Sequence, residues 1–229
     1  MLTSCHAKPV ILSLCLLASS ALAVTLGELT NQDASAGLKA ALEKGAVAAS
    51  GKLGVENGFL NNDQVRIPLP PILEQARPLL KMTGRGKDLD DLVVAMNHAA
   101  ETAVPMAKPL LLDAVKSMSV TDAKNILTGG ETSVTNFFRD KTSAQLAVQF
   151  LPIVKQVTDR SNLSAKYNSA MGAVSGLGAT PQQATVEGYV TQRTLDGLYK
   201  MIGEEEKAIR SNPAGSGSQI IGKVFGALR

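Results

Sequence analysis

The sequence contains few of the side chains that most enzymes use in their active sites. Its 229 residues include two cysteines, two histidines and no tryptophan, and only 3% are aromatic. Cys5, Cys15 and His6 all lie in the first 15 residues, within a segment that has the features of a targeting sequence. Without that segment the chain has no thiol and one imidazole, His98. Disulfides, cysteine nucleophiles, cysteine-bound metals and zinc sites with several histidines are then excluded.

The first 23 residues have the features of a cleavable signal peptide. Lys8 precedes an apolar run of thirteen residues, Val10 to Leu22, and the final Ala21-Leu22-Ala23 fits the small-x-small rule for signal peptidase. The run is too short to span a bilayer, which takes about 20 apolar residues. We therefore expect cleavage after Ala23, export to the periplasm and a single mature domain of residues 24–229.

The charge and hydropathy of the remaining chain argue against two kinds of partner. Loss of Lys8 lowers the formal net charge from +3 to +2. The basic residues are dispersed, without the cluster of about four to eight that marks anionic-membrane or nucleic-acid binding. No later segment approaches about 18 uninterrupted apolar residues. We therefore expect no nucleic-acid partner and no transmembrane anchor.

The apolar pattern predicts an all-α fold, a single irregular bundle of seven to nine helices. Apolar residues recur every three or four positions, and no alternating strand of five or more residues is present. Several helices should be short or proline-kinked. Pro105 and Pro109 predict a break or kink near Val104 with a new helix after it, and Pro152 predicts a kink in a helix that starts at Ser143. Thr180-Pro181 has the features of a helix start.

Residues 57–71 interrupt the helical pattern. The segment is rich in turn formers, and Pro68, Pro70 and Pro71 push each preceding residue toward extended backbone. We therefore predict an extended, proline-rich strap over residues 67–70, with Pro71 in the first turn of the next helix.

The segment from Asn61 to Pro71, which includes the predicted strap, carries the most unusual local chemistry in the chain. Arg66 lies between apolar Val65 and Ile67, a short distance after Asn61 and Asn62. One hypothesis, which we favour, is that the strap covers a helix face and Arg66 pairs with a carboxylate. The other is that Arg66 presents its guanidinium to a carboxylate or phosphate of a ligand. Arg139, which follows two phenylalanines, allows the same two hypotheses, with core packing expected for the rings.

Catalysis by acidic residues or histidine has weaker support. His98 could act as a general base oriented by Glu101, one helical turn on, but we favour an ordinary structural role at the edge of a helix stripe. Two carboxylates could serve a glycoside hydrolase, and the available clusters are residues 88–91 and 204–206. Each also fits its position, the aspartates at a helix N-terminus and the glutamates on a solvated helix face, where Glu206 would pair with Arg210.

Several motifs together resemble an exported bacterial family, domain of unknown function 4197. They are Gly58–Asn62, Arg66–Pro71, Met96–Glu101, Pro105 and Pro109, Ala123–Gly130, Phe138-Arg139, Tyr189–Gln192 and Glu204–Lys207. The resemblance spans nearly all of the mature chain. It implies an exported helical protein of one domain, and it supplies no catalytic residues because the family has no established activity.

These observations favour a non-enzymatic binding or interaction module of the cell envelope. Its expected partner is an envelope protein or a small apolar or amphipathic ligand held between kinked helices. The alternative is a cell-envelope hydrolase that uses carboxylates. We expect no cofactor, no metal and no catalytic residue. The candidate ligand-binding residues are Arg66, Asn61, Asn62, His98, Glu101 and Arg139.

Overall fold

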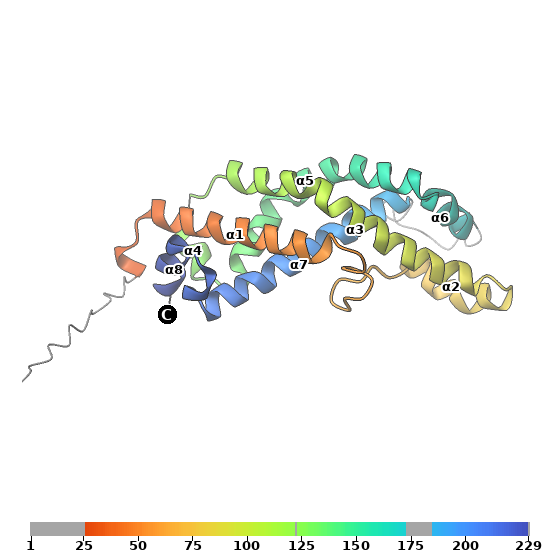
Figure 1. The fold of residues 1–229 in the computed structure, drawn as a ribbon, viewed down its shortest axis with the longest axis horizontal. Helices are drawn as coiled ribbons and strands as arrows, with labels where there is room; N and C mark the ends of the chain where they lie inside the picture. Colours follow the sequence, from red (N-terminus) through yellow and green to blue (C-terminus); the bar gives the residue numbers. More distant parts are fainter. Residues whose placement is uncertain (1–25, 122, 173–184, 229) are drawn as a thin grey trace, which may run out of the picture.

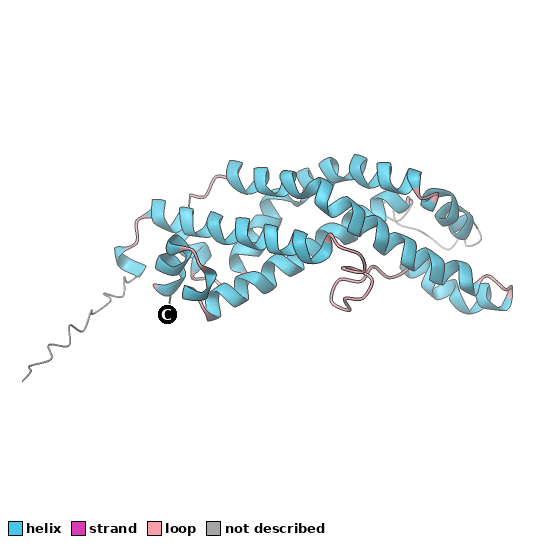
Figure 2. Cartoon of the chain, viewed as in Figure 1, coloured by secondary structure: helices cyan, strands magenta, loops and turns pink. Residues whose placement is uncertain are grey.

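The computed structural model describes residues 26–121, 123–172 and 185–228 (Figure 1). These residues form eight α-helices and two short 3-10 helices, and they contain no strand (Figure 2). The predicted all-α bundle is thereby confirmed, whereas the predicted signal peptide lies outside the described residues. The α-helices are α1 (Asn31–Leu53), α2 (Pro71–Met82), α3 (Gly86–Ser117), α4 (Ala123–Leu127), α5 (Ser133–Arg160), α6 (Leu163–Gly172), α7 (Val186–Ser211) and α8 (Gln219–Gly226).

Four long helices form the body of the bundle. α7 packs against α1 and α5, and α3 packs against the same two helices. The hairpin of α2 and α3 lies with α6 at one end of the elongated molecule, whereas α4 and α8 pack against α1 at the other end (Figure 1). One continuous core of buried apolar side chains links these helices. None of the helices in the described ranges is long and apolar enough to cross a bilayer.

Two predicted helix boundaries are wrong, because helices continue through them. α3 runs unbroken past Pro105 and Pro109, and α5 runs unbroken from Ser133 through the start predicted at Ser143 and past Pro152. A proline inside a helix costs about 3 kcal/mol. In both helices an apolar stripe is buried on each side of the proline, and this burial offsets that cost. The stripes are Ala103, Val104, Ala107, Leu111 and Val115 in α3, and Phe138, Leu146, Phe150 and Val154 in α5.

Other helix ends agree with local sequence signals. Pro71 is the first residue of α2, as predicted, and the preceding residues 66–70 have no helix or turn. The Thr180-Pro181 signal lies outside the described residues. The described part of the next helix, α7, begins at Val186, where the Thr185 side chain accepts a hydrogen bond from the Gly188 N–H and caps the helix.

Candidate functional site

Residues 57–70, which include the predicted extended segment 67–70 and are called the strap from here on, are fixed to α3 by the amide of Asn97. This side chain is completely buried. Its Oδ1 accepts the Ile67 N–H at 2.8 Å, and its Nδ2 donates to the Ile67 carbonyl at 2.9 Å. A further bond from Nδ2 to the Val93 carbonyl, at 2.8 Å, holds the amide on its own helix. Both backbone polar groups of Ile67, the neighbour of Arg66, are therefore satisfied by one side chain.

Glu101, one turn further along α3, fixes the beginning of the strap. Its buried carboxylate accepts the N–H groups of Asn57, Phe59 and Leu60, each at 3.0 Å. The Nε2 of His98 lies 3.9 Å from Glu101 Oε2, and the imidazole is 46% exposed. The two residues are neighbours, as their spacing predicts, but the Glu101 oxygens point to the strap backbone. Their geometry identifies Glu101 as an anchor for the strap.

The strap also packs on α7, and a glycine permits this contact. A Cβ on Gly197 would lie 2.7 Å from a ring carbon of Phe59, which is fully buried. Tyr189 Oη donates to the Pro68 carbonyl at 3.0 Å. Burial raises the pKa of the Tyr189 phenol, so the group remains a donor at neutral pH. Because α3 and α7 both hold the strap, the backbone at Arg66 is fixed in position.

Arg139 approaches the same region from α5. Its guanidinium carbon lies 5.1 Å from the centre of the Tyr199 ring, in a cation–π contact. The Tyr199 ring also packs against Phe138 in the core, in an edge-on contact with 5.7 Å between the ring centres. Burial raises the pKa of the Tyr199 phenol, and the hydrogen bond with Thr142 opposes this rise. Arg139 Nε is buried without a hydrogen-bond partner in the described part of the chain.

Arg66 and Arg139 line one surface hollow of about 310 Å³, which we call the strap hollow. In the described ranges neither guanidinium has a carboxylate within ion-pair distance or a hydrogen bond to another group. The acidic residue that lines the hollow, Asp196, pairs with Arg193 at 2.8 Å. Positive charge is therefore left in excess. The full lining is Gln64, Val65, Arg66, Pro68, Arg139, Arg193, Asp196, Gly197 and Lys200.

A second hollow, of about 350 Å³, adjoins the first along α7, and we call it the helix hollow. Arg139 and Lys200 line both hollows. Glu204 lies between two lysines in the helix hollow, 3.1 Å from Lys207 and 3.5 Å from Lys200. The hydrogen bond from Lys207 is the main reason that the pKa of Glu204 is lowered. Charge in this hollow is therefore more nearly balanced than in the strap hollow.

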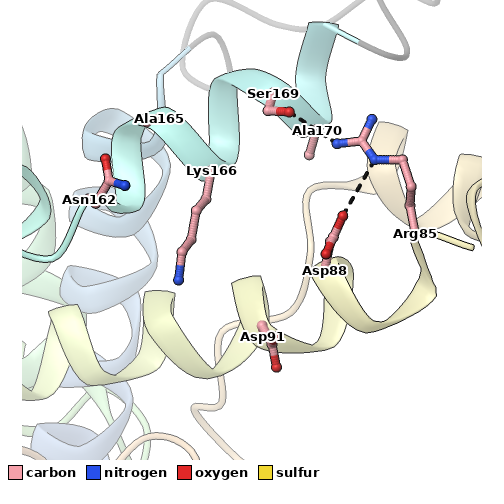
Figure 3. A pocket seen from close by; sticks show the side chains of 8 residues that line it. All are labelled: Arg85, Asp88, Asp91, Asn162, Ala165, Lys166, Ser169 and Ala170. Carbon is pink, nitrogen blue, oxygen red and sulfur yellow. Dashed lines mark hydrogen bonds and ion pairs between the residues drawn. The ribbon is translucent and has the colours of Figure 1, made fainter.

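A third hollow, of about 340 Å³, lies between α3 and α6 and contains two of the predicted hydrolase carboxylates (Figure 3). Asp88 points toward Arg85, 3.5 Å away, whereas Asp91 points away from α6 (Figure 3). Asp91 pairs with Lys87 at 3.0 Å. Both carboxylates are exposed and paired, and they do not converge on one point.

The structure brings together only some of the candidate residues. Arg66 and Arg139 share the strap hollow, and His98 contacts Glu101. Asn61 and Asn62 form the turn before Arg66, where the Asn62 carbonyl accepts the Arg66 N–H at 2.8 Å, and neither lines the strap hollow. Among the described residues, no three histidine, cysteine or acidic side chains are grouped as a metal ion requires.

Sequence reasoning missed the contributions of α7 and of Asn97. Arg193, Asp196, Lys200 and Lys207 recur at intervals of three, four and seven, so they mark one polar face of a predicted helix. That spacing could have identified the face of α7 that lines the strap hollow and the helix hollow. Asn97 is a polar residue beside the apolar stripe of α3, but nothing local identifies Ile67 as its partner.

A family model described as "Protein of unknown function (DUF4197)" matches residues 28–226 of the chain. The match therefore includes the strap, α7 and every residue that lines the strap hollow. No curated protein and no solved structure matches the chain.

Proposed function

We propose that the chain, which belongs to the DUF4197 family of proteins of unknown function, is an exported binding protein that holds an anionic ligand in the strap hollow. One observation carries the proposal. Arg66 and Arg139 come from separate elements, line the same hollow and have no carboxylate partner in the described residues. Arginine binds carboxylates and phosphates through paired N–H groups, so the two side chains form a receptor for either group.

The structure favours this ligand over the alternatives that the sequence suggested. The strap hollow is lined mainly by charged and polar side chains, which suit an anion better than an apolar or amphipathic molecule. It also contains no pair of free carboxylates, so binding rather than hydrolysis is its proposed role. The favoured sequence hypothesis paired Arg66 with a carboxylate of the protein, and no such pair is present within the described ranges.

Binding of inorganic phosphate, measured by isothermal titration calorimetry, tests this role. We expect the unmodified protein to bind phosphate and both Arg66→Ala and Arg139→Ala to weaken binding about tenfold or more, because a hydrogen bond to a charged group contributes about 1.5–3 kcal/mol. Arg160→Ala is the matched control, since Arg160 ends the same helix as Arg139 but lies outside the hollow. Equal affinity in all four proteins would contradict the proposal.

Export is the second part of the proposed function, and it rests on the sequence of residues 1–23. Expression of the full-length precursor in a Gram-negative host should place the protein in the periplasmic extract. Its intact mass should correspond to a chain that begins at Val24. Replacing Ala21 and Ala23 with bulky residues should retain the precursor, because signal peptidase requires small residues there. A full-length chain confined to the cytoplasm would contradict this part.

A further inference from the structure

The two hollows beside α7 differ in charge although they meet at Arg139 and Lys200. The strap hollow has three arginines and a lysine against one aspartate that is already paired. The helix hollow is lined by Glu131 and by Glu204, which lies between its two lysines, and it adds the neutral hydrogen-bonding side chains of Thr132 and Asn136. A ligand that extends through both hollows would therefore meet concentrated positive charge at one end and mixed donors and acceptors at the other.

We propose that the ligand is a hydroxylated organic anion, a sugar acid or a sugar phosphate. This inference rests on the proposed anion-binding function. The anionic group occupies the strap hollow between Arg66 and Arg139. The hydroxyl-bearing part lies in the helix hollow, where carboxylate and amide oxygens accept hydrogen bonds and ammonium and amide groups donate them.

The size and polarity of the site agree with this ligand. The hollows measure about 310 and 350 Å³, each at the lower end of the range of about 300–1,000 Å³ found for ligand sites. Asn136 is exposed, and its amide makes one long bond within the described part of the chain, 3.4 Å to Thr132 Oγ1. Its remaining hydrogen-bonding capacity is available to a ligand. Tyr199 is buried beneath Arg139, so recognition would depend on hydrogen bonds rather than on stacking against an exposed ring.

Glucose 6-phosphate and inorganic phosphate separate the anionic contact from the hydroxyl contact. We expect glucose 6-phosphate to bind the full protein at least about tenfold more tightly than inorganic phosphate, and glucose alone to bind far more weakly. Glucuronate and acetate repeat the comparison for a carboxylate. Tighter binding of glucose 6-phosphate than of glucuronate identifies the anionic group as a phosphate, and the reverse order identifies a carboxylate.

Asn136→Ala should reduce the preference for glucose 6-phosphate to about threefold or less while leaving phosphate binding unchanged. Asn168→Ala, which removes an exposed amide on α6, is the control and should preserve the preference. Arg139→Ala should weaken the binding of both anions. If phosphate binds but neither hydroxylated anion binds more tightly than its simple counterpart, this inference is overturned and the proposed function stands. If no anion binds, both fail.

Discussion

Glu206→Ala should destabilise the folded protein by about 3–5 kcal/mol, the usual cost of removing one partner from a buried ion pair. The Glu206 side chain is 4% exposed, and its carboxylate is 2.8 Å from the guanidinium of Arg210. It also accepts the N–H groups of Val134 and Thr135, at 3.1 and 2.8 Å, and the Thr135 hydroxyl at 2.7 Å. Alanine would remove the acceptor of the Val134 and Thr135 groups and the carboxylate partner of Arg210.

The contacts of Glu206 explain why the effect should be large. Val134 and Thr135 lie in the first turn of α5, whose N-cap residue, Thr132, makes no side-chain capping bond. Glu206 therefore caps α5 from another helix and places negative charge at the positive end of its dipole. Arg210 extends the connection by donating to the Leu127 carbonyl and to Ser133 Oγ, both at 2.9 Å. One ion pair thus joins α4, α5 and α7.

Urea unfolding followed by circular dichroism measures this prediction. Glu205→Ala is the control, because Glu205 precedes Glu206 on α7 and is only partly buried. Its free energy of unfolding should stay within about 0.5 kcal/mol of the unmodified value. Glu206→Gln keeps the shape of the side chain and one acceptor oxygen, so its free energy of unfolding should lie between those of Glu206→Ala and Glu205→Ala. A loss below about 1 kcal/mol in Glu206→Ala would show that water replaces the carboxylate at little cost.

Glu206 also illustrates what the sequence could and could not predict. The spacing to Arg210 correctly indicates an ion pair within one helix, but the predicted solvated face is wrong for Glu206. Its other partners lie about 70 residues away, in the first turn of α5. Helical periodicity predicts only which residues share a face of one helix, and the burial of that face depends on packing between distant segments.

The candidate site likewise combines features that local sequence predicts with contacts between distant segments that it does not predict. Prolines and turn formers predicted the strap, and the apolar neighbours of Arg66 drew attention to this residue. The sequence showed dispersed basic residues, yet the fold brings Arg66, Arg139, Arg193 and Lys200 to one hollow. Their convergence depends on a strap, α5 and α7 that meet only in three dimensions. The buried helix stripes likewise preserve α3 and α5 across prolines that local rules treat as breaks.

Asn97→Ala should weaken phosphate binding about tenfold, to the level expected for Arg66→Ala, although Asn97 does not line the strap hollow. Its amide satisfies both backbone polar groups of Ile67, the residue after Arg66. Alanine would leave a buried N–H and a buried C=O without partners, at about 1–3 kcal/mol each. The strap should then leave α3 locally, and Arg66 would lose its fixed position relative to Arg139.

A double-mutant cycle distinguishes this positioning role from a general loss of stability. If Asn97 acts through Arg66, Asn97→Ala should have no further effect on phosphate affinity in the Arg66→Ala background. Independent effects would instead multiply, giving about a hundredfold loss in the double variant. Tyr189→Phe removes one strap bond, to the Pro68 carbonyl, and provides a milder variant that should fold normally. Its phosphate affinity should fall by less than that of Asn97→Ala, because the two bonds to Ile67 remain and continue to hold the backbone beside Arg66.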